Sequence, residues 1–179
     1  LRRLDATADE ILVVGEQMLA DESAAREALC AEIDPTLSPA EVGDLIKDDH
    51  PATFPEAIEE YRDAMNRARA FIVEHDLATP PRQDRLKVIE TPPYQRHLIP
   101  FAAYYQPPRF DPDPAGTYIV TPPGTPDMWR EHNYASISNT SVHEAYPGHH
   151  MQLAGANENP SLVRALSLST LPPEARRAC

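Results

Sequence analysis

The distribution of proline restricts the fold of this chain more than any other feature of its sequence. Twelve of its 20 prolines lie between Pro80 and Pro126, and only four precede them. A proline inside a helix removes a backbone hydrogen bond and clashes with the preceding turn. Long helices are therefore predicted outside this stretch, and short strands joined by turns are predicted within it.

Three short runs in the proline-rich stretch combine β-branched and aromatic residues. They predict strands at Leu86–Glu90, Phe101–Tyr105 and Thr117–Thr121. Because these residues are interleaved with the prolines, the stretch has apolar surface to bury and is not predicted to be disordered. We expect a small sheet here.

Capping boxes mark the start of three helices before Thr79. In such a box a Thr or Ser caps the first turn and a Glu three residues later bonds back to the cap. The three boxes are Thr7–Glu10, Ser38–Glu41 and Thr53–Glu56. The first helix is predicted to run to about Glu32, with Ile11, Val14, Met18 and Leu29 near one face. The third has the clearest buried stripe, formed by Ile58, Tyr61, Met65, Ala68 and Ile72 and widened by Phe71.

The fold class predicted from these elements is mostly α with a small β-sheet, an α+β fold. Residues 1–79 form a helical part. Residues 80–179 form an incomplete catalytic part that holds the short strands and a metal-binding helix. We expect the two parts to be one continuous domain.

The metal-binding helix is predicted from the segment His143-Glu144-Ala145-Tyr146-Pro147-Gly148-His149-His150. Zinc peptidases often carry His-Glu-x-x-His on a helix, where the two histidines share a face and the Glu serves as general base. A regular helix fails here, because the residue four after His143 is Pro147. His150 would lie on the face of His143 but about 10.5 Å further along the axis.

Pro147 and Gly148 together predict an interruption of this helix. Proline cannot continue the hydrogen-bond pattern, and glycine adopts backbone angles that other residues avoid. If these two residues form a bulge, the rest reads His143-Glu144-Ala145-Tyr146-His149, with normal spacing. His149 would then join His143 as a zinc ligand, and His150 would orient a ligand or face the substrate. The alternative is a short helix that ends at Tyr146, followed by a loop with merely polar histidines.

The same segment, continued by Met151-Gln152, resembles the signature of a bacterial family called domain of unknown function 885. Ile99–Tyr105, Phe110–Pro114 and Gly116–Pro122 also resemble that family. The resemblance implies a mostly helical, gluzincin-like zinc metallopeptidase with Glu144 as the catalytic base. It further implies a third zinc ligand, a Glu within a later Glu-Gly-Trp motif.

That Glu-Gly-Trp motif is absent, and Glu174 is the residue at about the expected separation. Several other residues are candidates to orient ligands or to contact substrate. They are Gln152, just after the motif, and Tyr104, Tyr105, His132 and Tyr134, whose side chains can donate a hydrogen bond to a developing oxyanion. Ordinary packing is the competing explanation for the last four.

Charge and hydropathy limit the classes of partner. The chain has 16 Lys and Arg against 28 Asp and Glu, a net charge of −12. Nucleic-acid binding needs clustered positive charge and is not expected. No stretch approaches the roughly 20 apolar residues of a membrane-spanning helix. The chain begins at Leu1 and its last helical pattern stops abruptly at Leu171-Pro172-Pro173, so we expect a member truncated at both ends.

The predicted function of the intact protein is zinc-dependent hydrolysis of a peptide or small amide substrate. His143 and His149 would hold the metal, and Glu144 would take a proton from the attacking water. Two alternatives stay open. The chain could be an inactive or incomplete metal-binding fragment, or its parent could be a metal-dependent hydrolase of non-peptide amides or esters.

Overall fold

The structure, a computed structural model, describes residues 6–166, apart from the side chains of Arg164 and Leu166. The chain divides into two compact units, residues 1–46 and 47–179. The predicted division into 1–79 and 80–179 stays a prediction. In the structure the third helix, from the first of these parts, packs against strands of the second.

Long helices and short strands appear where the prolines allow them. The N-terminal helices are α1 (Ala8–Ile33), α2 (Pro39–Asp48) and α3 (Phe54–Glu74). The proline-rich stretch holds β1 (Leu86–Glu90), the 3-10 turn η1 (Pro93–Gln95), β2 (Ala102–Tyr105) and β3 (Gly116–Val120). The remaining elements are α4 (Pro126–Trp129), η2 (Arg130–His132), α5 (Tyr134–Glu144), α6 (His149–Asn157) and α7 (Leu162–Leu166). The predicted α+β class is therefore confirmed.

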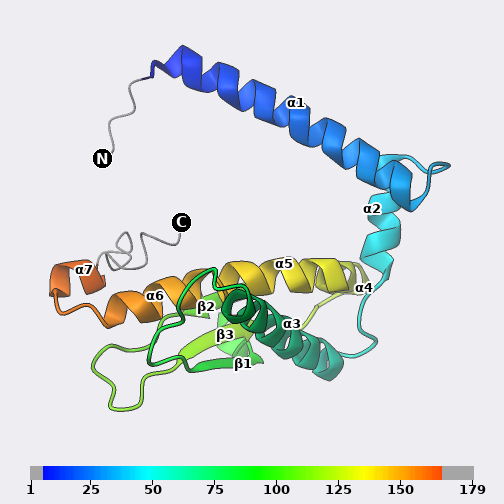
Figure 1. Ribbon diagram of the computed structural model, residues 1–179. Helices are drawn as coiled ribbons and strands as arrows, with labels where there is room; N and C mark the ends of the chain where they lie inside the picture. Colours follow the sequence, from blue (N-terminus) through cyan, green and yellow to red (C-terminus); the bar gives the residue numbers. More distant parts are fainter. Residues whose placement is uncertain (1–5, 167–179) are drawn as a thin grey trace. The chain divides into compact units, whose positions relative to one another are not determined.

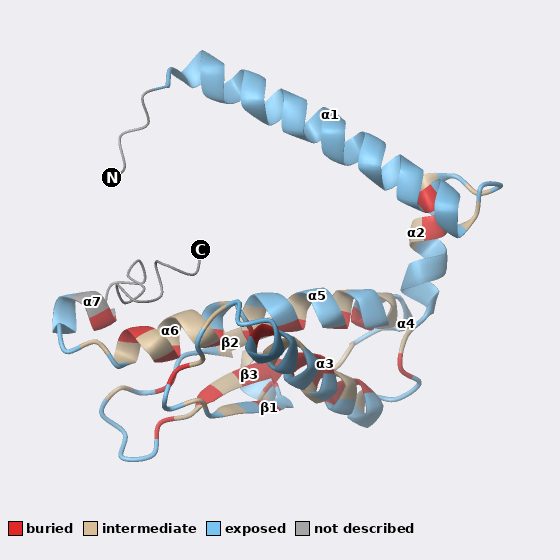
Figure 2. Ribbon diagram, viewed as in Figure 1, coloured by how far each residue is buried: buried red, intermediate tan, exposed pale blue. Residues whose placement is uncertain are grey.

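Helix α1 begins at the predicted capping box, in which the Thr7 side chain accepts from the Glu10 amide. Its apolar residues are nevertheless exposed. Ile11, Val14, Met18 and Leu29 each have half or more of their surface exposed. Cys30 is the one buried residue of the helix (Figure 2). The apolar stripe is thus present, but the described residues of its own unit leave it exposed.

The described residues contain no helix that combines the length and the hydropathy needed to cross a bilayer.

The second unit contains a mixed three-stranded sheet, in the order β1-β3-β2. Strand β1 runs parallel to β3, with Val88 opposite Tyr118. Strand β2 runs antiparallel to β3, with Tyr104 opposite Tyr118. Strand β3 is therefore the buried middle strand, and β1 and β2 form the edges among the described residues.

Helix α3 supplies one wall of the core. Its Thr53 capping box is formed, and Ile58, Tyr61, Met65 and Ile72 are buried as the stripe predicted. They pack with Val88, Tyr118, Val120, Ile137, Ala145 and Tyr146. Phe71 is an exception to the prediction, because it is 54% exposed beside that stripe. Figure 2 shows the buried residues gathered on β3 and along α3.

Helices α5 and α6 follow each other end to end (Figure 1). Helix α5 is capped by the Asn133 side chain, which accepts from the Ser136 amide at 2.8 Å. It packs against α3 and ends at Glu144. The predicted bulge is therefore a full break between two helices, Ala145–Gly148, and α6 runs from His149 to Asn157.

Candidate metal centre

The break between α5 and α6 depends on a very close approach of two backbone segments. The Gly148 amide donates to the Val142 carbonyl at 3.1 Å, and the Met151 amide donates to the Ala145 carbonyl at 3.3 Å. A Cβ added at Gly148 would lie 1.7 Å from the His143 carbonyl oxygen. Real Cβ atoms do not approach backbone atoms so closely, so this turn requires glycine. The peptide bond between Tyr146 and Pro147 is cis.

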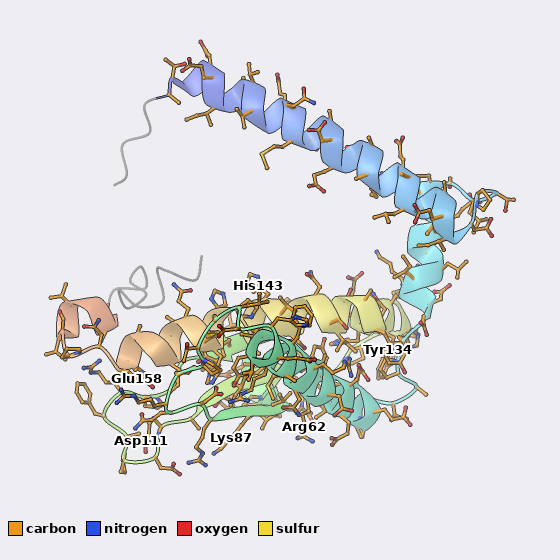
Figure 3. The ribbon with its side chains drawn as sticks, viewed as in Figure 1. Arg62, Lys87, Asp111, Tyr134, His143 and Glu158 are labelled. Atoms are coloured by element: carbon orange, nitrogen blue, oxygen red, sulfur yellow. The ribbon has the colours of Figure 1, made fainter. Side chains whose placement is uncertain are left out.

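This turn brings three potential metal ligands together. One ligand atom from each of His143, Glu144 and His149 can be chosen so that all three lie within 4.8 Å of one another. The two imidazole rings meet edge to face, with their centroids 4.8 Å apart. His143 lies at the end of α5, next to the start of α6 (Figure 3). The two histidines are exposed and Glu144 is half-buried, so a small ion from solvent can reach the cluster.

The chemistry of this donor set fits zinc. Imidazole nitrogen and carboxylate oxygen bind Zn²⁺ at about 2.0–2.2 Å, so two ligand atoms of one ion lie at most about 4.4 Å apart. The cluster of His143, Glu144 and His149 spans 4.8 Å, slightly more than that limit. Small side-chain rotations would therefore suffice for all three to reach one ion. Alternatively the two histidines would bind, with the Glu144 carboxylate just beyond bonding distance.

The negative charge of Glu144 contributes to the raised pKa values of two tyrosines, Tyr104 and Tyr118. Burial raises the pKa of the Tyr104 hydroxyl, and the negative charge of Glu144 raises it further. The pKa of Tyr118 is raised by burial first, with Tyr61 and Glu144 adding to the effect. Both hydroxyls therefore stay protonated and remain hydrogen-bond donors.

His150 points away from the cluster into the protein. Its side chain is 0% exposed. Its Nδ1 lies 3.0 Å from the Tyr104 hydroxyl, and its Nε2 lies 3.2 Å from Asp84 Oδ1. The structure therefore separates two adjacent histidines, with His149 beside His143 and His150 in the interior. Since His150 is fully buried, a role facing the substrate finds no support in its position.

Tyr104 and Gln152 lie beside the cluster. The Tyr104 ring stacks on that of His149, with the ring centroids 6.4 Å apart and the planes 20° from parallel. Gln152 stands one turn after His149 on α6, so the two share a face of that helix, and it is half-buried. Both positions suit a residue that orients a ligand.

The other three predicted residues lie elsewhere. Tyr105 follows Tyr104 on a strand, so its side chain leaves the opposite face of the sheet, and it is 45% exposed. Tyr134 is at the far end of α5 from His143 (Figure 3), roughly 13 Å away along the axis at 1.5 Å per residue. His132 is buried in the core, where its Nδ1 meets the Tyr61 hydroxyl at 3.0 Å. Glu174 lies outside the described residues.

A largely buried carboxylate behind the cluster, with a side chain that is 10% exposed, was not foreseen from the sequence. Asp84 bonds to the Tyr146 hydroxyl and to His150, and its Oδ2 accepts from Arg69 Nε at 2.6 Å. Burial alone would raise its pKa, but these hydrogen bonds and the charge of Arg69 lower the pKa to about 2. No local sequence signal marks Asp84, which sits in a proline-bounded segment 66 residues from His150.

The fold and the cluster define a mostly helical α+β protein with a centre of two histidines and one glutamate at a helix break. The chain belongs to the family described as "Bacterial protein of unknown function (DUF885)", whose model matches residues 2–171. The predicted family is therefore confirmed.

A solved structure has a similar fold. It is the crystal structure of "the putative lipoprotein from Colwellia psychrerythraea", which matches with a TM-score of 0.74 and 17% sequence identity. The match covers 92% of this chain and 29% of that one, so this chain spans under a third of that protein's length. No curated protein matches this chain.

Proposed function

We propose that this chain carries the metal-binding and proton-transfer residues of a zinc-dependent hydrolase that cleaves peptide bonds. The observation that carries the proposal is the convergence of His143, Glu144 and His149 within 4.8 Å across a helix break. Histidines on one regular helix would not meet with this spacing. The break also restricts the sequence, because only glycine fits at position 148.

Each residue of the cluster has a separate role in this reaction. The imidazoles of His143 and His149 would hold the ion. A bound Zn²⁺ supplies Lewis acidity, which makes a water more acidic and polarises the carbonyl to be cleaved. The Glu144 carboxylate accepts a proton from the attacking water and then donates it to the leaving amine. Its half-buried position leaves it accessible to that water.

An extended peptide suits the surroundings of the cluster. Among the described residues β2 pairs with β3 on one side only, so its other edge has no strand partner, as an added peptide strand would require. Tyr104 of β2 stacks on His149, so this strand lies beside the cluster. A peptide bound along β2 would therefore pass close to Glu144. This arrangement favours a peptide over other amides or esters.

A catalytic zinc usually has three protein ligands and one open position. His143 and His149 would supply two of these protein ligands, so the proposed zinc requires a third. Since Glu144 is the proposed base, Glu174 and a residue of a longer protein are the candidates. The length of the Colwellia structure, of which this chain matches 29%, leaves room for the last.

The test is zinc content together with peptide turnover, measured on the parent chain and three variants. We expect close to one zinc per chain in the parent and little in His143→Ala or His149→Ala. Glu144→Gln should retain zinc if Glu144 is the base, and should lose turnover by roughly a hundredfold or more. His97→Ala, which alters an exposed histidine outside the cluster, is the matched control.

Three results would contradict the proposal. One is zinc binding that survives both His143→Ala and His149→Ala. Another is full turnover by Glu144→Gln. The third is cleavage of esters without any cleavage of peptides, which would assign the centre to a different hydrolase class.

A further inference from the structure

The two histidines of the cluster sit on different helices, so helix geometry alone does not set their separation. His143 is the next-to-last residue of α5, and His149 is the first residue of α6. Two backbone hydrogen bonds cross the break, from Gly148 to Val142 and from Met151 to Ala145. Neither bond fixes the angle between the two helices by itself. A contact from outside the break can add to these two bonds.

Asp84 contacts the buried side of this break at two points. Tyr146, inside the break, donates its hydroxyl hydrogen to Asp84 Oδ1. His150, the second residue of α6, reaches the same oxygen at 3.2 Å. Asp84 belongs to neither helix, since it lies just before β1. Its side chain is 10% exposed, so water competes little for these bonds.

Asp84 is itself anchored to a third element. Its Oδ2 accepts from Arg69 Nε on α3 at 2.6 Å, and the Arg69 guanidinium lies 6.0 Å from the centre of the Tyr146 ring. All three donors to Asp84 therefore come from elements of the second unit that pack around the break. A carboxylate with three donors is well satisfied for a buried charge.

The bonds to His150 continue toward the cluster. Its Nε2 faces Asp84, and its other ring nitrogen, Nδ1, lies 3.0 Å from the Tyr104 hydroxyl. The Tyr104 ring in turn stacks on His149. Gly116 makes room for this contact, because a Cβ there would lie 2.7 Å from His150 Nδ1 and 2.9 Å from the Tyr104 oxygen.

We propose that Asp84 is a positioning residue that holds α6 against α5 through Tyr146 and His150, and so sets the approach of His149 to His143. It touches neither the substrate nor the ion. The consequence for metal binding rests on the proposed function, whereas the hold on the helix break does not. Partners behind metal ligands typically change metal affinity about 10–100-fold when they are altered.

The experiment compares Asp84→Asn with the parent chain, first without metal. Asn is nearly the same size as Asp but cannot satisfy all three donors. We expect amide hydrogen exchange at Gly148 and Met151 to accelerate at least about tenfold, with little change at the Thr91 amide, which bonds to Val120 across the sheet. Asp113→Asn is the matched control, since Asp113 pairs with Arg85 in an exposed ion pair.

Zinc affinity is the second readout. Asp84→Asn should weaken zinc binding by about 10–100-fold and should shift the visible absorption of the cobalt-substituted chain. Tyr146→Phe removes one donor to Asp84 without charge and should change both readouts in the same direction by less. It keeps the test usable if Asp84→Asn folds poorly. Asp113→Asn should change neither the zinc affinity nor the absorption of the cobalt-substituted chain.

The possible failures are distinguishable. Unchanged exchange at Gly148 and Met151 in both variants would overturn the hold of Asp84 on the break. Faster exchange with unchanged zinc affinity and spectrum would overturn its positioning role and leave the proposed function intact. No zinc in the parent chain would overturn the proposed function, and the exchange rates would still decide whether Asp84 holds the break.

Discussion

Two fully buried histidines show how position determines the chemistry of a residue type. His150 is 0% and His132 is 1% exposed, and both bond to a tyrosine hydroxyl. His150 also lies within hydrogen-bond distance of the Asp84 carboxylate. His132 is surrounded by aromatic rings, including Phe54, Phe101 and Trp129. The surroundings of His132 disfavour a positive charge. Burial lowers its pKa to about 4, although a backbone hydrogen bond and the charge of Glu131 act in the opposite direction.

This lowered pKa predicts that stability falls in mild acid. Between about pH 6.5 and pH 4, the unfolded chain binds a proton at His132 that the folded chain does not. The contribution of His132 is therefore fully present above pH 6.5 and is lost as the pH falls toward 4. The loss would reach about 3 kcal/mol, at 1.36 kcal/mol for each pKa unit. Urea unfolding at several pH values measures it.

His132→Asn provides the comparison, because the Asn amide can replace Nδ1 beside Tyr61 but does not titrate. Its unfolding free energy should depend less on pH between 4 and 6.5 than that of the parent. Parallel curves for the two proteins would show that His132 is not responsible.

At the scale of elements, the break between α5 and α6 matters more than either helix. Continuous helix through residues 145–148 would leave His143 and His149 on different faces. The break redirects the chain, and its tightest point is Gly148 against the His143 carbonyl. Gly155, inside α6, differs in this respect, because a Cβ there would meet nothing within 4 Å. These two glycines, seven residues apart, form a natural matched pair.

Alanine substitution should therefore act in opposite directions at the two positions. Gly148→Ala forces the backbones apart and should lower the free energy of unfolding by about 3 kcal/mol or more. Gly155→Ala should raise it by up to about 1 kcal/mol, because alanine favours helix over glycine. Denaturant midpoints of both variants at constant slope give the comparison. Equal midpoints for Gly148→Ala and the parent would be incompatible with the close approach described.

At the scale of the whole molecule, the proposed metal binding would be coupled to folding. The cluster draws its ligands from both sides of the break and exists only when α5 and α6 meet. An ion that binds the folded cluster more tightly than the unfolded chain stabilises the fold by mass action. The same coupling applies whether the chain acts alone or within a longer protein like the Colwellia structure.

Zinc should accordingly raise the melting temperature of the parent chain. At a free concentration about 100 times the dissociation constant, the gain is about 2.7 kcal/mol. That corresponds to roughly 5–10 °C for a chain of this size. A chelator should reverse the shift, and His149→Ala should abolish it. An equal shift in parent and His149→Ala would mean that zinc acts at some other place.

Much of the fold could be predicted from the sequence because its signals are local. The capping boxes at Thr7 and Thr53 start helices as expected, and β1 has the predicted bounds. The family could also be recognised, since the residues that resemble it lie close together in the chain. The pairing of His143 with His149 followed from the intolerance of a helix for Pro147, a property of neighbouring residues.

The sequence by itself determined which residues could form a metal centre and where the chain had to break. Only the tertiary structure decided that His150 is fully buried, that Asp84, Arg69 and Tyr146 meet behind the break, and that His132 is buried. The physical reason is distance along the chain. Caps, turns and helix periodicity act over a few residues, whereas the partners of Asp84 are brought to it from up to 66 residues away by packing around one core.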